Sequence, residues 1–357
     1  MITGETSKDI KEYRKIPRFS YSSLKLYVEN RKKFYKEEIL GDKKEKEETD
    51  FMRMGSVCDV LLTDKDNWED YYIVSSANKP TGQLLTFTEN VFKRHKINLD
   101  VEGNLTISTE QLFSEAYQDL VDGNGGKKLR DGINKFIERF DKEAADYYRE
   151  LCLSEGKTVL TIEEVQTAER IVQTLKTAEN TKDIVNAISG NEIEVFRKHP
   201  ILFHYKGHDL KSELDQIIVN HEEKIIEIFD YKCTSFVEFF ISSYLEYKYY
   251  LQQALYRIAA KSWTKQQGWE DYKVGYMNFI AFDQINYYKP IIVKMNSDNF
   301  EQGLNGFRIN GRKYDGVNKI LDDITYSIDS DIWDMSVDNL KNNGVVSIPV
   351  FDSYKTN

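Results

Sequence analysis

The order of apolar and polar positions predicts a chain in which helices are interleaved with a smaller number of strands. Apolar residues three and four apart indicate amphipathic helices, whereas short β-branched and aromatic runs between polar turns indicate strands. We expect helices at residues 19–34, 51–62, 108–121, 128–150, 161–188, 235–263 and 317–326. We expect strands at 71–74, 191–203, 214–219, 224–229, 272–281 and 287–294, with a turn at Pro200. This mixture favours an α/β fold with a mixed central sheet flanked by helices.

The two runs of strongest strand character form a predicted β-hairpin. The first is LDQIIV at 214–219 and the second is KIIEIF at 224–229, with the polar turn NHEE between them. Asp215 lies in the first run, and the second run leads directly into Asp230, Tyr231 and Lys232. Side chains two apart on a strand point to one face, so Asp230 and Lys232 share a face, and pairing of the runs brings Asp215 within reach.

Two carboxylates and an ammonium group at the end of apolar strands are costly to bury unless they have partners. The simplest explanation is a divalent metal held by Asp215 and Asp230, with Lys232 beside it. The tripeptide D-x-K is common by chance, so other segments have to support this interpretation.

One supporting segment is the predicted helix 51–62, FMRMGSVCDVLL, in which a single acid, Asp59, stands among apolar residues. Gly55 permits close approach of a neighbouring backbone. Asp59 is either an exposed helical carboxylate or, because the surrounding positions are apolar all round, a buried group.

A second supporting segment is the long helix predicted after the hairpin. Its residues Leu245, Tyr249, Gln252, Tyr256 and Ala259 are spaced four, three, four and three apart, which places them on one helix face. Such a stripe is most often part of a core. A place near the carboxylates for its polar member Gln252, or less well for Gln253, is implied only by the family resemblance given next.

These segments, in this order, resemble the PD-(D/E)XK nuclease superfamily, and most closely its phage RecE-like and RecB-nuclease-like exonuclease branch. The matching parts are the opening helix with FSYSSL at 19–24, Gly55-x-x-x-Asp59, Asp215 followed by Asp230-x-Lys232, and Gln252-x-x-x-Tyr256. The RecB-type pattern has His where this chain has Asp59, and a carboxylate suits Mg²⁺ at least as well. The resemblance implies a restriction-endonuclease-like core.

The resemblance also implies the roles of individual residues. Asp215, Asp230, the backbone carbonyl of Tyr231 and Asp59 would be metal ligands for Mg²⁺, or for Mn²⁺ in its place. Lys232 would act on the attacking water and the phosphate, and Gln252 and Tyr256 would support it. Glu192, Glu194 and Glu213 are three further acids near the hairpin, and the sequence does not choose among them.

Four segments follow from this interpretation. They are a first part of the nuclease core at 17–76, a helical insertion at 77–190, the core with the hairpin and the Q-x-x-x-Y helix at 191–299, and a C-terminal extension at 300–357. The charged helix at 128–150 is either solvated and stabilised by ion pairs four residues apart or a contact surface for DNA backbone. The extension, rich in Asp, is expected to be a solvated cap or an oligomer contact.

Composition narrows the cellular setting. The 357 residues carry a net charge of −10, which is unusual for a nucleic-acid-binding protein and weighs against the nuclease hypothesis unless a basic groove or a bound metal offsets it. No apolar run approaches the ~20 residues of a membrane span, and the first residues lack the apolar segment of a signal peptide. Three widely spaced cysteines, Cys58, Cys152 and Cys233, fit a reducing cytoplasm and give no pair for a cysteine-ligated cluster.

The sequence therefore predicts a Mg²⁺-dependent deoxyribonuclease, with an exonuclease on linear duplex DNA as the form that the resemblance favours. From the resemblance alone come a role in phage-type recombination or repair, a single-strand annealing protein as partner, and a ring-like homo-oligomer. The alternatives are a catalytically silent protein of the same fold in a recombination or anti-defence complex, and an acidic interaction scaffold.

Overall fold

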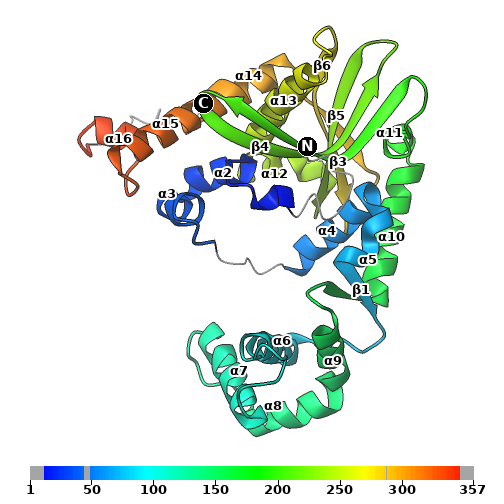
Figure 1. The fold of residues 1–357 in the computed structure, drawn as a ribbon, viewed down its shortest axis with the longest axis vertical. Helices are drawn as coiled ribbons and strands as arrows, with labels where there is room; N and C mark the ends of the chain where they lie inside the picture. Colours follow the sequence, from blue (N-terminus) through cyan, green and yellow to red (C-terminus); the bar gives the residue numbers. More distant parts are fainter. Residues whose placement is uncertain (1–11, 44–48, 287, 346–357) are drawn as a thin grey trace, which may run out of the picture. The chain divides into compact units, whose positions relative to one another are not determined.

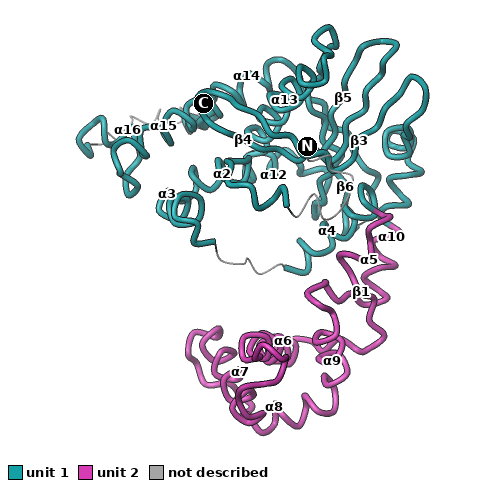
Figure 2. Tube along the Cα trace, viewed as in Figure 1, with its two compact units in different colours: residues 1–64, 171–357 teal, residues 65–170 magenta. Residues whose placement is uncertain are grey.

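The computed structural model describes residues 12–43, 49–286 and 288–345. Two compact units are present, and each is described by itself (Figure 2). The first comprises residues 1–64 and 171–357, and the second comprises residues 65–170. No helix in the described ranges is long and apolar enough to cross a membrane.

The first unit is built on a five-stranded sheet with the order β3-β4-β5-β6-β7 (Figure 1). Neighbouring strands are antiparallel except β5 and β6, which are parallel, so the sheet is mixed. The predicted hairpin is present, with Ile218 opposite Glu227. The strands are β3 (Ile193–Tyr205), β4 (His208–Asn220), β5 (Ile225–Thr234), β6 (Lys273–Asp283) and β7 (Ile291–Lys294).

Helices cover both faces of this sheet. On β4, Ile217 and Val219 belong to the main core, which includes Leu251 and Leu255 of helix α13 (Tyr249–Gln266). Gln216 points to the other face, where its side-chain amide donates to the Ile184 carbonyl of α11 (Lys182–Val185). The period-two alternation of the strand therefore sets which helix lies on which face.

The other elements of this unit surround the sheet. The remaining helices are α2 (Tyr21–Glu29), α3 (Arg31–Phe34), α4 (Asp50–Thr63), α12 (Phe240–Glu246), α14 (Ser297–Asn305), α15 (Val317–Ser330) and α16 (Val337–Lys341). Helix α10 (Ile162–Thr177) is divided between the units, and only its residues from 171 onward belong to the first. Short π or 3₁₀ segments are η1 (Tyr35–Ile39) and η4 (Val237–Phe239), and a small hairpin is formed by β8 (Phe307–Ile309) and β9 (Arg312–Tyr314).

Helix α15 corrects the expectation that the chain after residue 300 is a solvated cap. Val317, Ile320, Leu321 and Ile324 are buried in the main core, and the Tyr27 hydroxyl of α2 hydrogen-bonds Ser327 at 3.0 Å. The acidic residues that suggested a solvated segment alternate with this apolar stripe at helical spacing, which makes the helix amphipathic. The part of the extension beyond residue 345 lies outside the described residues.

The second unit is mainly helical and has its own core. Its elements are η2 (Lys65–Asn67), α5 (Trp68–Tyr71), β1 (Tyr72–Ser75), α6 (Gly82–Ile97), α7 (Thr109–Gly123), α8 (Ile133–Arg139), η3 (Phe140–Ala144), α9 (Ala145–Leu153) and β2 (Thr158–Thr161). Phe87, Phe136 and Phe140 are buried together, and β1 pairs in parallel with β2.

The charged residues of this unit pair with one another along the helices. Lys135 lies 2.7 Å from Asp131, and Lys142 lies 2.7 Å from Glu138, both four residues apart. The ion pairs expected for a solvated helix are thus present. The compact unit spans 65–170, whereas the sequence suggested an insertion at 77–190. The C-terminal bound lies earlier than suggested because residues from Ile171 onward pack with the first unit. For example, the Asn180 side chain donates a hydrogen bond to the Pro290 carbonyl.

Several element boundaries differ from the sequence prediction for local reasons. Pro200 does not mark a turn, because β3 runs through it and pairs it with Glu213. The long helix predicted after the hairpin is two helices, α12 and α13, because Lys248 adopts a left-handed φ of 60° between them. The opening helix, expected from residue 19, begins at Tyr21, because Ser20 and Ser23 form a reciprocal capping box at its start.

Candidate active site

The candidate site lies where β4 and β5 stop pairing. Their ladder ends at Gln216 and Phe229, so Asp215 and Asp230 follow directly beyond the last pair. The Tyr231 amide, which lacks a ladder partner on β4, donates instead to Asp215 Oδ2 at 2.9 Å. We call this point, where β4 and β5 separate beyond Gln216 and Phe229, the fork. It brings the two carboxylates close together, and the separation of the strands leaves room between them.

The second strand of the fork carries a linked acid, base and amide. Lys232 Nζ lies 2.5 Å from Asp230 Oδ2, which shows that the two side chains share a face as predicted. Gln252 of α13 donates from Nε2 to Asp230 Oδ1 at 2.8 Å. Asp230 and Gln252 are 1% and 3% exposed, so this pair is held away from bulk water.

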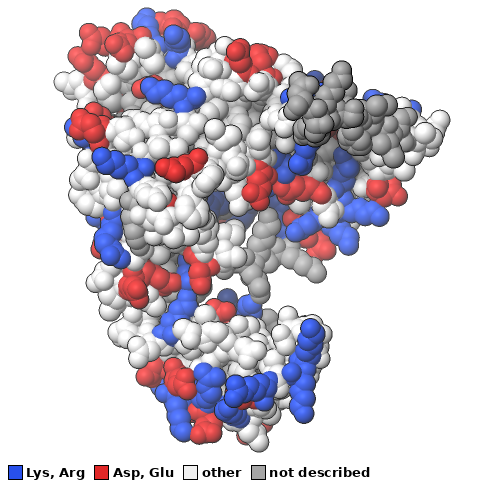
Figure 3. All heavy atoms as spheres, turned by 180° about the vertical axis from the view of Figure 1, so that it is seen from behind, with Lys and Arg blue, Asp and Glu red and all other residues white. Residues whose placement is uncertain are grey.

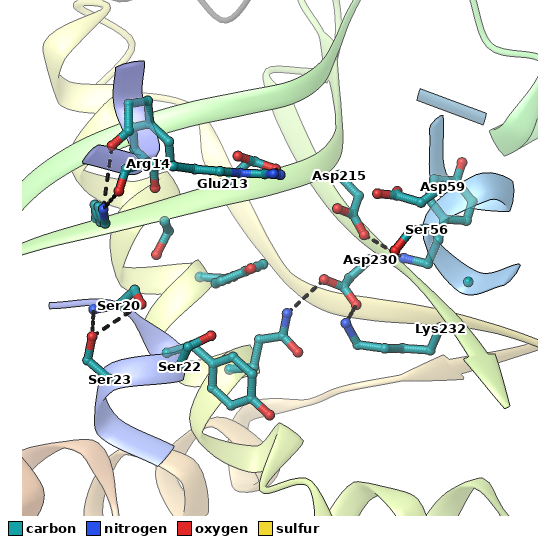
Figure 4. Close-up of a pocket in the computed structure, with 18 of the residues that line it drawn as sticks. Arg14, Ser20, Ser22, Ser23, Ser56, Asp59, Glu213, Asp215, Asp230 and Lys232 are labelled. Carbon is teal, nitrogen blue, oxygen red and sulfur yellow. Dashed lines mark hydrogen bonds and ion pairs between the residues drawn. The ribbon is translucent and has the colours of Figure 1, made fainter. Parts of the chain in front are cut away.

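These groups line a pocket of about 550 Å³ within the first unit (Figure 4). Figure 4 shows Asp59, Asp215, Asp230 and Lys232 pointing toward one another from α4, β4 and β5. The lining residues are Tyr13, Arg14, Arg18, Ser20, Tyr21, Ser22, Ser23, Glu38, Lys43, Gly55, Ser56, Asp59, Lys211, Ser212, Glu213, Asp215, Asp230, Tyr231, Lys232, Cys233, Gln252, Tyr256 and Phe282. All the site residues predicted from the sequence are therefore brought to one pocket.

Helix α4 delivers Asp59 to this pocket. The helix is capped by the Thr49 hydroxyl, which accepts a hydrogen bond from the Met52 amide. Gly55 faces Cys233 of β5 so closely that a β-carbon on it would lie 3.4 Å from the Cys233 β-carbon. Val57, Cys58, Val60, Leu61 and Leu62 are all buried, which explains why the apolar pattern around Asp59 is continuous. Helix α4 thus packs on β5 at Gly55 and Cys233, with Asp59 one helical turn further along.

The structure also separates the alternatives that the sequence left open. Glu213 lines the pocket, whereas Glu194 pairs with His221 at 3.2 Å and Glu192 is exposed. Gln253 donates to the Asn299 carbonyl of α14 at 2.6 Å, so it serves helix packing, and Gln252 is the amide that reaches the carboxylates.

A residue that the sequence analysis did not single out, Lys198 of β3, contacts the acidic side of the site. Its ammonium is paired with Asp59 Oδ2, lies 3.0 Å from Asp215 Oδ1, and is 3.9 Å from Glu213 Oε1. Lys198 is 8% exposed. A lysine within a predicted strand is a feature that the sequence shows, and it could have marked Lys198 as a candidate. The alternation of side chains along the strand, however, does not indicate that this lysine faces Asp215.

The backbone at Lys198 explains why alternation fails. Its φ is 49°, in the left-handed region. Phe196 and His199 are three residues apart and would face opposite sides of a regular strand, yet both rings lie 5.0 Å from Trp263 of α13. The left-handed residue therefore shifts the alternation between the two halves of β3.

Burial and neighbouring charge set the protonation of the cluster. Burial alone would raise the pKa of Asp215, but the ammonium groups of Lys198 and Lys232 outweigh it and hold that pKa below its ordinary value. Burial raises the pKa of Asp59 to about 6, against the opposing effect of Lys198. Burial also raises the pKa of Asp230 to about 7, with Lys232 opposing the rise and Asp215 adding to it. Asp215 is therefore the most firmly ionised of the three carboxylates.

Two further side chains stay protonated for the same reasons. Burial would lower the pKa of Lys232, but Asp230 and other negative neighbours raise it above its ordinary value. Burial, followed by the charges of Asp230 and Asp215, raises the pKa of Tyr256 well above its ordinary value. Lys232 is thus a stable cation and Tyr256 a neutral hydroxyl at the pocket wall.

The donor chemistry fits a hard divalent cation. Asp59 Oδ1 and Glu213 Oε2 are buried oxygens without a hydrogen-bond partner within the described residues, whereas Asp230 Oδ2 is in contact with the Lys232 ammonium. Such oxygens are costly to bury alone, and Mg²⁺ prefers oxygen ligands. No group of three or more His, Cys, Asp or Glu side chains converges as a ready-made ligand set in the described ranges. A cation here would keep several waters, as Mg²⁺ does when one or two carboxylates hold it.

Basic side chains are also among the residues that line this pocket. Arg14, Arg18, Lys43 and Lys211 line it. Lys211 donates to the carbonyls of Arg14 and Ile16 at 2.8 Å each, which fastens the segment before α2 against β4. On the face seen in Figure 3, acidic and basic side chains are interspersed over the surface. Three of the cations that line the pocket are paired with acids of the protein: Arg14 with Glu213 at 3.0 Å, Lys43 with Glu38 at 3.1 Å and Arg18 with Asp209 at 3.9 Å.

Comparisons with known proteins add a distant structural likeness. No protein-family model matches the sequence, and a search of curated proteins finds no match. Among solved structures, the chain resembles the crystal structure of a “Putative exonuclease” from Eubacterium rectale, with 10% sequence identity and a TM-score of 0.47. The likeness covers 97% of this chain and 96% of the other. At this identity and score, the likeness does not assign an activity to this chain.

Proposed function

We propose that this protein is a metal-dependent deoxyribonuclease that hydrolyses phosphodiester bonds, acting as an exonuclease on linear duplex DNA. The observation that carries the proposal is the convergence of Asp215, Asp230 and Lys232 at the fork of β4 and β5, inside a pocket. Two buried carboxylates and a partly buried ammonium from two strands are kept together there at a cost that folding alone does not explain.

The carboxylates are the groups that would hold the metal. Asp215 and Asp230, with the Tyr231 carbonyl and Asp59 as further oxygen donors, would hold one or two Mg²⁺ ions, and Mn²⁺ has the same ligand preference. When bound, such ions activate a water and neutralise charge on a phosphate. Gln252 fixes the orientation of Asp230 through its 2.8 Å hydrogen bond.

Lys232 supplies a fixed positive charge in this scheme. Its ammonium lies beside Asp230 and 5.0 Å from the centre of the Tyr249 ring, so the side chain is held at the pocket wall. From there it can donate a hydrogen bond to the attacking water and stabilise the negative charge that develops on the phosphate. Tyr256, protonated and adjacent, can donate to a phosphate oxygen.

The basic side chains that line the pocket account for binding of a polyanion by an acidic protein. Phosphate contacts from Lys and Arg dominate affinity for nucleic acid and act over short range. Arg14, Arg18, Lys43 and Lys211 are gathered at this pocket, so backbone phosphates on either side of the scissile one would meet cations. Binding is accordingly expected to weaken steeply with added salt.

The test is digestion of end-labelled linear duplex DNA in Mg²⁺, followed by product size against time. The wild type should release small products from the ends. Asp215→Ala, Asp230→Ala and Lys232→Ala should each abolish the reaction while the proteins remain folded by circular dichroism. Glu194→Gln, which alters a carboxylate paired with His221, is the matched control and should stay active.

A panel of nicked, closed-circular and linear substrates then separates the forms of the activity. Cleavage of closed circles would make the protein an endonuclease and correct the exonuclease part. DNA binding without any cleavage would identify a catalytically silent fold. Wild-type rates in all three alanine variants would remove the proposed site altogether.

A further inference from the structure

Lys198 is the buried cation of the acidic cluster, and the reaction scheme gives it no role. Its ammonium contacts Asp59 and lies 3.0 Å from Asp215, so it bridges a helix carboxylate and a strand carboxylate. Both carboxylates line the pocket and Lys198 is not among its lining residues, although the side chains of Lys198 and Asp215 are similarly buried, at 10% and 12% exposure. The ammonium therefore neutralises these acids from the protein interior while their other sides face the pocket.

The chain holds Lys198 there despite an unfavourable backbone. A residue with a side chain is disfavoured at a φ of 49°, and such conformations persist where the surroundings impose them, often at functional sites. Contacts of the neighbouring residues hold the backbone in this conformation. Phe196 and His199 both pack on Trp263, and Arg197 donates to the Ala187 carbonyl at 2.6 Å. The position of the ammonium is thus fixed from both sides.

Charge balance shows what the lysine does for the cluster. At mildly alkaline pH, where the carboxylates of Asp59, Glu213, Asp215 and Asp230 are all ionised, these four acids contact three cations, Lys198, Lys232 and Arg14. One negative charge is left in excess with Lys198 present, and two without it. A divalent ion brought to Asp215 would lie close to the Lys198 ammonium, and like charges in a buried site repel strongly.

We propose that Lys198 is a built-in counter-ion of the carboxylates. Its ammonium already neutralises part of the negative charge that a divalent cation would neutralise, and it thereby weakens divalent-cation binding there. This inference rests on the proposed metal site. Lys198 is a positioning residue in this scheme: it keeps Asp59 beside Asp215 without metal, and the incoming ion has to overcome its charge. The proposal therefore predicts opposite effects of removing Lys198 on metal-free stability and on metal affinity.

The experiment is calorimetric titration of Mn²⁺ into the wild type, Lys198→Met and Lys198→Arg, with thermal unfolding of each in EDTA and in Mn²⁺. Compared with the wild type, Lys198→Met should bind Mn²⁺ at least tenfold more tightly and unfold at a lower temperature in EDTA. Its unfolding temperature should also rise more when Mn²⁺ is added. Lys198→Arg keeps the charge and should bind within about threefold of wild type. Lys319→Met is the control, because it removes an ammonium paired with Asp323 and Asp338 on α15 and α16. It should lower the unfolding temperature without changing Mn²⁺ affinity.

The outcomes separate the two proposals. If the wild type binds Mn²⁺ and Lys198→Met binds it equally or more weakly, the counter-ion proposal is overturned and the metal site stands. If no variant binds Mn²⁺, the metal site itself is refuted. Should Lys198→Met fail to fold, Lys198→Gly takes its place, because glycine favours the left-handed backbone, and the same affinity comparison decides.

Discussion

The hydrogen bond from Gln252 to Asp230 offers a quantitative test of the site geometry that does not depend on activity. The two side chains come from α13 and β5, are 3% and 1% exposed, and are joined at 2.8 Å. Gln252→Leu removes the donor and leaves Asp230 Oδ1 without this hydrogen bond. Because the residue is on the buried face of α13, leucine can occupy a similar volume.

The expected magnitude follows from the charge of the acceptor. A hydrogen bond to a charged group contributes roughly 1.5–3 kcal/mol, and a buried carboxylate cannot replace the lost donor with bulk water. Gln252→Leu should therefore lower the free energy of unfolding by about 2 kcal/mol. In an Asp230→Ala background the acceptor is already gone, so the same substitution should cost close to nothing.

The assay is urea unfolding of the four members of this double-mutant cycle in EDTA, at mildly alkaline pH so that Asp230 is ionised. The coupling energy between the two positions should be about 2 kcal/mol. Gln253→Leu is the matched control, because Gln253 donates to carbonyls of Tyr250 and Asn299 and should show no coupling to Asp230. A Gln252–Asp230 coupling near zero would show that the two side chains are not joined as described.

Two further predictions concern the framework around the site. Burial lowers the pKa of His199 to about 4. Between about pH 6.5 and 4 the unfolded chain therefore binds a proton that the folded chain does not, so the free energy of unfolding decreases as the pH is lowered through this range. Replacing His199 with Phe should remove about 3 kcal/mol of this acid destabilisation, measured as the difference between wild-type and variant unfolding energies across that range; parallel pH profiles would contradict the assignment. A β-carbon on Gly303 of α14 would overlap the Tyr250 carbonyl oxygen and the Gln253 amide of α13. Gly303→Ala should therefore cost about 1–3 kcal/mol in urea unfolding, whereas Gly190→Ala, with no described atom within 4 Å of the added carbon, should cost far less.

The hairpin and its acids could be predicted because local patterns determine them. Two apolar runs around a four-residue polar turn specify pairing, and a spacing of two places Asp230 and Lys232 on one face whatever the rest of the chain does. Helix periodicity placed Gln252 on one face of its helix, whereas its place beside the carboxylates was implied only by the family resemblance. In each case the information lies within a few residues, and the structure brings these side chains to one pocket.

Other features depend on contacts between distant segments. The left-handed backbone at Lys198 is imposed by packing on Trp263 of α13, so reading β3 with a period of two cannot show that Lys198 faces Asp59 and Asp215. The acidic residues of α15 obscured an apolar stripe that is buried against α2. Apart from Lys232, the basic side chains that line the pocket come from the segment before α2, from the chain after η1 and from β4, which no local pattern relates.

The central claim is that Asp215 and Asp230 form a metal site at the fork of β4 and β5. The most direct measurement is an anomalous-scattering map from crystals soaked in Mn²⁺, with an Asp215→Asn crystal as the control. The account predicts a peak bound by the carboxylates of both residues in the wild type, and its loss or strong weakening in the variant. A wild-type map without density at the fork, or with Mn²⁺ held elsewhere on the protein, would contradict it.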